Sequence, residues 1–164
     1  MPSLPGFQDL FAATAAALAA LPVRALFTVG NEIDLSTLPP LPPNVRLERW
    51  VPQHAVMAHT AAMVSHGGAG TTRMALAAGV PAVVVPGIAD QFRNAERVAR
   101  LGAGLALANA SEAPERLEDA LRALLDEPRF TVAARRVAAE VAALPPLADA
   151  SGVLYEQLRP ARAA

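Results

Sequence analysis

A cluster of glycines in the middle of the chain is flanked by side chains that can hydrogen-bond an anion. The residues of this cluster are His66, Gly67, Gly68, Gly70, Thr71 and Thr72. Glycine lets a backbone approach a ligand closely, and the unbonded amides at the start of a helix attract negative charge. An apolar run followed by a glycine turn and then a helix therefore predicts a site for a phosphate-bearing ligand. An ordinary turn between a strand and a helix is the alternative.

A second polar group follows the next apolar run. Residues 80–85 read as a buried strand, and Asp90 and Gln91 come just beyond its carboxyl end, where open α/β sheets bind ligands. A carboxylate and an amide together can accept from and donate to vicinal hydroxyls. The alternative is that the pair caps a helix beginning near Phe92. Asn94 is a weaker candidate, for which a structural role is the alternative.

The elements that must position these residues alternate between helix and strand. Helices are expected at 9–20, 71–78, 92–101, 131–143 and 148–158, with a further helix starting in 111–115, and strands at 23–29, 45–48, 62–65, 80–85 and 104–107. The proline-rich segment 31–44 is expected to be a surface connection. This alternation predicts one α/β domain over residues 1–164, with a parallel sheet and helices on both faces.

The composition of the chain excludes several classes of function. The chain has 164 residues, a net charge of -1, three histidines and no cysteine. A near-neutral chain without a basic run is a poor nucleic-acid binder, and the absence of cysteine excludes disulfides and thiolate metal sites. The longest apolar stretch, 11–29, is interrupted by Pro22 and Arg24, so no membrane span is expected. These features favour a cytoplasmic protein.

At this point the motifs resemble a known family. The strings are HGGAGTT at 66–72, GVP at 79–81, DQ at 90–91 with NA at 94–95, and WVPQ at 50–53. They are similar to the nucleotide-sugar signature of family 1 glycosyltransferases, especially the bacterial natural-product and sterol-type enzymes. The resemblance implies a Rossmann-like domain, one half of a GT-B fold, that binds a dTDP- or UDP-sugar for inverting sugar transfer to a small-molecule acceptor. It implies no cofactor and no metal.

The family's functional residues carry over by position. Trp50 would stack on the nucleobase, Gln53 would hold the base edge, and Asp90 and Gln91 would contact sugar hydroxyls. His66 would stabilise the leaving diphosphate. The full set of donor-binding residues implied by the resemblance is Trp50, Gln53, His66, Gly67, Gly68, Gly70, Thr71, Thr72, Asp90 and Gln91.

Met74 departs from the pattern of many relatives, which carry a glutamate there that holds the ribose hydroxyls. A methionine cannot accept those hydrogen bonds but accommodates an apolar deoxyribose edge. The substitution favours a thymidine diphosphate sugar. UDP stays open, because sterol-type relatives also lack the acid.

The first ten residues, MPSLPGFQDL, do not read as the central strand with which such a domain normally begins. The amino-terminal acceptor domain, which carries the catalytic base, is also expected to be missing. We therefore expect a vacant position in the sheet, and donor binding without transfer by this chain alone. The alternatives are a separate donor-binding subunit that works with an acceptor-binding partner, a non-catalytic nucleotide-sugar-binding module, or a homo-oligomer.

Overall fold

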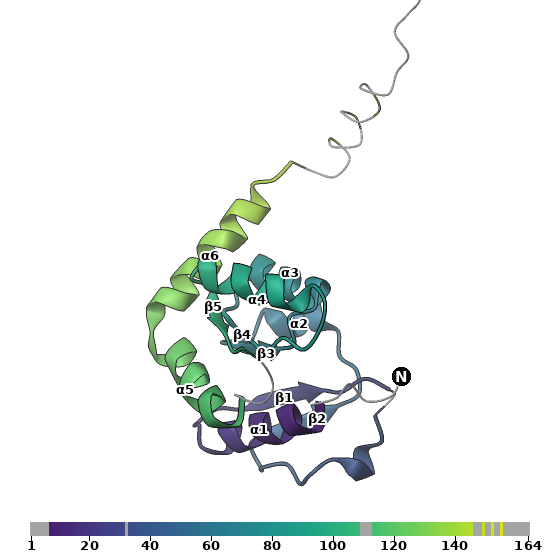
Figure 1. Cartoon of the computed structure of the whole chain (residues 1–164). Coiled ribbons are helices and arrows are strands. Elements are labelled where there is room, and N and C mark those ends of the chain that lie inside the picture. The colour runs from purple at the N-terminus through teal and green to yellow at the C-terminus, as the bar shows by residue number, and fades with distance from the viewer. Residues whose placement is uncertain are drawn as a thin grey trace, which may run out of the picture.

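The computed structural model describes residues 7–31, 33–108 and 113–145, together with residues 149, 152 and 155. The elements are α1 (Phe7–Ala19), β1 (Ala25–Thr28), the 3-10 turn η1 (Leu35–Thr37), β2 (Val45–Glu48), α2 (Gln53–Met57), β3 (Met63–Ser65), α3 (Ala69–Ala77), β4 (Ala82–Val84), α4 (Gln91–Arg100), β5 (Gly104–Ala106), α5 (Ala113–Asp126) and α6 (Pro128–Ala142) (Figure 1). Helix and strand alternate along the chain, as predicted.

All strand pairs in the described part of the chain are parallel, which confirms the α/β class. The strands form two sheets, however. β1 pairs with β2, with Ala25 opposite Val45. In the other sheet β4 lies between β3 and β5, so that Ala82 lies opposite both Met63 and Gly104. No pairing joins the two sheets within the described residues.

Strand β4 is covered on both faces. Val83 and Val85 point into a cluster formed with α1 and α5, whereas Ala82 and Val84 pack against Ala95 and Val98 of α4. This alternation follows from the two-residue period of a strand. Helices α1 and α5 therefore cover one face, and α3 and α4 lie on the other.

The larger cluster spans the two sheets. Its buried members come from α1, β4, α5 and α6 and include Leu18, Val83, Leu117, Leu121, Leu124 and Phe130. Partly buried side chains of β1 and β3 pack against these residues, among them Ala25, Phe27 and Val64. Helices α1 and α5 pack side by side (Figure 1). The two sheets thus share one apolar core.

The differences from the predicted boundaries have local causes. Helix α3 begins at Ala69, two residues earlier than expected, because Gly68 serves as its N-cap. Helix α6 begins at Pro128, where the fixed φ and missing N–H of proline suit the first turn. Of the helix expected at 148–158, residues 149, 152 and 155 are helical and the others lie outside the described residues. The helices that the structure describes include none long and apolar enough to cross a bilayer.

Candidate donor-binding site

Gly67 is the tightest point of the turn between β3 and α3. Its φ is 83°, and a β-carbon there would lie 2.6 Å from Val84 Cγ1 and 3.2 Å from the Gln91 carbonyl oxygen. Its amide donates to Ser65 Oγ at 3.2 Å. Only glycine adopts this conformation without strain and leaves this space. The turn therefore lies directly against the start of α4.

Among the described residues, no side chain caps the first amides of α3. The Thr72 amide donates to Gly68 O at 3.0 Å and so begins the helical hydrogen-bond series. The amides of Ala69, Gly70 and Thr71 precede it, and Gly68 offers no side chain to cap them. Three N–H donors and the positive end of the helix dipole therefore face the space beyond β3, an arrangement that suits an anion.

His66 lies over this turn. Its side chain is exposed, and its Nε2 atom lies 2.7 Å from the position that a β-carbon on Gly68 would take. The absence of a side chain at Gly68 thus allows the imidazole to rest against the backbone that leads into α3. An imidazole N–H at this place can donate to the same anion as the helix amides.

The two threonines of the motif differ in how deeply they are buried. Thr71 is half-buried, whereas Thr72 is buried and its Oγ1 has no hydrogen-bond partner among the described residues. The Thr72 hydroxyl is therefore shielded from solvent. Its predicted contact with a ligand stays a prediction.

Asn94 joins the glycine turn to the second polar group. Its Nδ2 donates to Gly67 O at 2.8 Å and to Asp90 Oδ2 at 3.0 Å. Asp90 is exposed at the N-cap of α4, but its side chain makes no capping hydrogen bond to that helix. The carboxylate is thus held beside the turn by Asn94. Sequence reasoning ranked Asn94 below its neighbours, although its spacing of four from Asp90 on a helix was a usable signal.

Gln91 is buried and holds the loop that follows β4. Its Oε1 accepts from the amides of Gly87 at 2.8 Å and Ile88 at 3.1 Å. In this loop Ala89 has a φ of 53°, a left-handed conformation that alanine rarely adopts. The amide oxygen of Gln91 is therefore committed to the protein, and the described residues supply no hydrogen-bond partner for its NH₂ group.

The candidates for the nucleobase site follow β2, a strand of the other sheet. Trp50 follows the carboxyl end of β2 and is 73% exposed, which excludes a role as a core aromatic. Gln53 is the first residue of α2 and is half-buried. Met74, on α3, packs against the cluster of Met57, Ala75 and Val80. Within the described residues no hydrogen bond joins Trp50 or Gln53 to the glycine turn.

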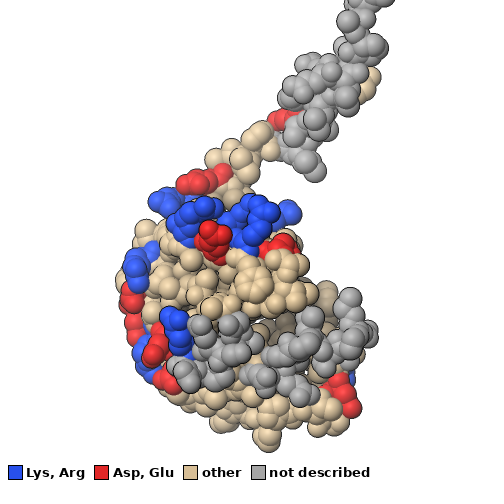
Figure 2. All heavy atoms as spheres, viewed as in Figure 1, with Lys and Arg blue, Asp and Glu red and all other residues tan. Residues whose placement is uncertain are grey.

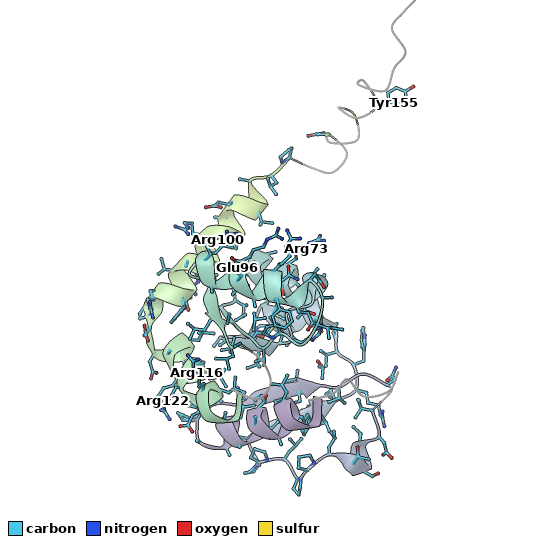
Figure 3. The ribbon with its side chains drawn as sticks, viewed as in Figure 1. Arg73, Glu96, Arg100, Arg116, Arg122 and Tyr155 are labelled. Atoms are coloured by element: carbon cyan, nitrogen blue, oxygen red, sulfur yellow. The ribbon has the colours of Figure 1, made fainter. Side chains whose placement is uncertain are left out.

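Two hollows of the described structure lie away from the predicted site. A hollow of about 540 Å³ lies between the end of α1 and residues 42–44, and one of about 300 Å³ lies between α2 and α6, and neither is lined by a residue predicted for the site. Charged side chains gather over the outer surface of α3, α4 and α6 (Figure 2). There Arg73 of α3 and Glu96 and Arg100 of α4 point outward to solvent (Figure 3). Acids and arginines are mixed on this face, as is usual for a solvated helix surface.

Comparison with known proteins defines the class. The chain belongs to the family of domains described as "Erythromycin biosynthesis protein CIII-like, C-terminal domain", which matches residues 14–156. Its fold is that of the carboxyl-terminal half of a GT-B glycosyltransferase. The resemblance seen in the motifs is confirmed.

Individual relatives agree. Elloramycin glycosyltransferase ElmGT of Streptomyces olivaceus is 45% identical over 159 residues, 92% of this chain and 39% of that protein. For 4'-demethylrebeccamycin synthase of Lentzea aerocolonigenes, the identity is 42% over 134 residues, 82% of this chain and 31% of that protein. The structure of spinosyn rhamnosyltransferase SpnG complexed with thymidine diphosphate superposes with a TM-score of 0.83 at 30% identity, over 91% of this chain and 41% of SpnG. The chain thus spans well under half the length of these relatives.

Proposed function

We propose that this chain is the part of an antibiotic-type glycosyltransferase that binds the sugar donor, a nucleoside diphosphate sugar. One observation carries the proposal: the free amides of Ala69, Gly70 and Thr71 lie beside His66, and Asn94 ties the same turn to the Asp90 carboxylate. An anion-binding helix start next to a hydroxyl-binding carboxylate matches the two ends of a sugar diphosphate.

In the proposed reaction the bond between the anomeric carbon and the diphosphate oxygen breaks as the acceptor oxygen attacks from the opposite side, with inversion. Negative charge then grows on the leaving diphosphate. The α3 amides, the helix dipole and His66 stabilise it, each hydrogen bond to a charged oxygen being worth roughly 1.5 to 3 kcal/mol. The base that takes the acceptor proton is expected in the part of the enzyme that this chain does not span. The proposal requires no metal.

The remaining candidate residues are assigned to the sugar and the nucleoside of the donor. Asp90, held by Asn94, accepts from sugar hydroxyls, and the NH₂ group of Gln91 donates to them. The exposed Trp50 ring offers a stacking face for the base, with Gln53 beside its edge. Met74 favours a deoxyribose, in keeping with the thymidine diphosphate bound by SpnG. The proposed donor is therefore a dTDP-sugar, with a natural-product acceptor.

Isothermal titration of the chain with dTDP in the presence of EDTA tests the diphosphate site. We expect binding to persist with the chelator and to weaken in His66→Ala by roughly 1.5 to 3 kcal/mol. His59→Ala is the matched control, because His59 is exposed on the turn after α2 and takes no part in the site. Binding that disappears with EDTA, or that is equal in the two variants, contradicts the proposal.

The nucleotide preference has its own test at residue 74. We expect dTDP to bind the wild-type chain more tightly than UDP, and Met74→Glu to shift the preference toward UDP, because a carboxylate can accept from both ribose hydroxyls. Competitive titration of the two nucleotides on both proteins measures the shift. Tighter binding of UDP to the wild type would remove the deoxyribose argument and leave the diphosphate site untouched.

A further inference from the structure

Two large apolar side chains are exposed on either side of Asp90. Ile88 is 51% exposed and Phe92 is 47% exposed, and each is two residues away from Asp90 along the chain. Covering such side chains is favourable, and exposed apolar groups beside a polar site are typical of a surface that contacts a ligand. The segment between β4 and α4 therefore offers apolar as well as polar groups at the donor site.

The backbone of Ile88 is fixed through both of its polar groups by one buried residue. Its amide donates to Gln91 Oε1 at 3.1 Å, and its carbonyl oxygen accepts from the Gln91 amide at 3.2 Å. The same Oε1 atom accepts from the Gly87 amide at 2.8 Å. The Ile88 side chain thus projects from a segment that is bonded to the first turn of α4.

Ala89 adds conformational strain to this segment. Among the described residues it is the one non-glycine residue with a positive φ, which is 53°. Such a residue is strained there, and strain of this kind persists where surrounding contacts impose it, often at a ligand site. The chain therefore keeps Ile88 exposed against both a hydrophobic and a conformational penalty.

The proposed reaction places the acceptor next to this segment. The acceptor oxygen attacks the anomeric carbon from the side opposite the diphosphate, so the acceptor must touch the donor's sugar. In the proposed function Asp90 and Gln91 hold that sugar, and the amides of α3 hold the diphosphate. A molecule that lies beyond the sugar is therefore beside the residues that border Asp90. This step rests on the proposed function.

We propose that Ile88 and Phe92 form a contact surface for the acceptor, and that the acceptor is apolar next to its reacting hydroxyl. The donor suits this surface less well, because its polar groups are already matched by the α3 amides, Asp90 and Gln91. An apolar ring system instead gains by covering two exposed side chains. This chain thus contributes to the choice of acceptor in addition to binding the donor.

Methyl NMR of the full chain tests the contact directly, because the sequence has two isoleucines, Ile33 and Ile88. Ile33 is the internal control, since it follows β1 of the other sheet, where its carbonyl oxygen accepts from Arg49 Nη1 at 3.1 Å. The probe is naphthol, an apolar ring system with one hydroxyl, added with and without dTDP. We expect a saturable shift of the Ile88 methyl signals and none at Ile33, whereas the polar ring alcohol inositol shifts neither. Equal shifts at both isoleucines, or none at Ile88, overturn the proposal.

Substitutions at the two apolar positions provide a second test, measured by the fluorescence of naphthol. We expect Ile88→Ser and Phe92→Ser each to weaken naphthol binding about fivefold and to leave the affinity for dTDP within about twofold. Val132→Ser is the matched control, because Val132 is 65% exposed on α6, which carries no residue of the proposed site. Equal naphthol binding by the three variants overturns the proposal. Loss of dTDP affinity in Ile88→Ser assigns the side chain to the donor and also overturns it.

The same titrations separate this proposal from the donor assignment. Binding of dTDP without a naphthol shift at Ile88 overturns the acceptor surface alone. Absence of dTDP binding, with the naphthol shift intact, overturns the donor assignment and the acceptor role with it. A shift of Ile88 on dilution of the chain without probe means that a second copy covers the side chain, and this result overturns the proposal too.

The strained turn has its own pair of variants. Ala89→Gly relieves the strain but frees the backbone, whereas asparagine tolerates the left-handed region and stays more restricted than glycine. We expect naphthol binding to fall about threefold in Ala89→Gly and to stay within about twofold of the wild type in Ala89→Asn. The affinity for dTDP should be unchanged in both. Naphthol binding by Ala89→Gly at the wild-type level overturns the role of Ala89 in positioning Ile88.

Discussion

The two sheets of this domain differ in how completely their strands are covered. In the sheet of β3, β4 and β5, every residue of β4 is buried, and Val83 and Val84 have no exposed surface. In the sheet of β1 and β2, the residues of β1 alternate between half-buried and exposed. Both sheets pack on the same α1 and α5 layer, but α4 also covers the second face of β4, whereas Leu26 and Thr28 on the second face of β1 are exposed. The glycine turn and the Asp90 loop are carried by the sheet whose central strand is fully enclosed.

The largest expected effect comes from Gly67 in the enclosed sheet. Gly67→Ala places a β-carbon against Val84 and Gln91 at a positive φ, and we expect a loss of roughly 3 kcal/mol of unfolding free energy. Gly70→Ala is the control, because a β-carbon there meets no atom within 4 Å. Urea denaturation of both variants measures the difference. Equal stability of the two variants would mean that the turn at Gly67 has room for a β-carbon in solution.

A truncation in each sheet tests the comparison itself. Val83→Ala empties space in a fully buried strand and should cost roughly 2 to 3 kcal/mol of stability. Leu26→Ala removes more atoms but from a side chain that is 38% exposed, and should cost less than about 1 kcal/mol. Thermal denaturation of the two variants shows which of them loses more stability. A larger loss from Leu26→Ala would show that the Leu26 side chain is buried in solution.

Two asparagines hold backbone carbonyls, one for each sheet. Asn44 Nδ2 donates to Leu18 O at 2.8 Å and Val23 O at 2.9 Å, and so fixes the end of α1 beside β1. Asn94 holds Gly67 O and Asp90 in the same way. Asn44→Ala should lower stability by roughly 1 to 3 kcal/mol and leave dTDP affinity unchanged.

Asn94→Ala should instead weaken donor binding. Without the amide, the glycine turn and Asp90 lose their common anchor, and we expect about tenfold weaker binding of a dTDP-sugar, or about 1.4 kcal/mol. Calorimetry on both asparagine variants tests whether Asn94→Ala weakens donor binding while Asn44→Ala does not. If Asn94→Ala binds the donor as the wild type does, the turn and the carboxylate do not need to be held together.

The smallest expected effect is a gain. Ala89 occupies the left-handed region at a φ of 53°, where glycine is not strained, so Ala89→Gly should raise stability by about 0.5 kcal/mol after the entropy cost of glycine. Chemical denaturation resolves a shift of this size when the two proteins are measured side by side. A loss of stability would mean that Ala89 is not strained in solution.

Much of this architecture could be predicted from the sequence, because it depends on local patterns. The apolar runs placed β2 at 45–48 and β4 within 80–85, and the glycine cluster at 67–70 placed the turn before α3. The links between segments could not be predicted in the same way. The bond from Asn94 to Gly67 joins residues 27 positions apart, and the inward turn of the Thr72 hydroxyl depends on how α3 packs. Such contacts are set by tertiary packing, which a single sequence does not display.

The claim that the start of α3 holds the donor's diphosphate has one direct test. Amide proton and nitrogen chemical shifts of the full chain are recorded with thymidine and then with dTDP, in EDTA. The account predicts that dTDP shifts the amides of Ala69, Gly70 and Thr71 strongly, whereas thymidine leaves them in place. Unchanged shifts at these three amides, with saturable binding of dTDP seen elsewhere in the chain, would contradict it.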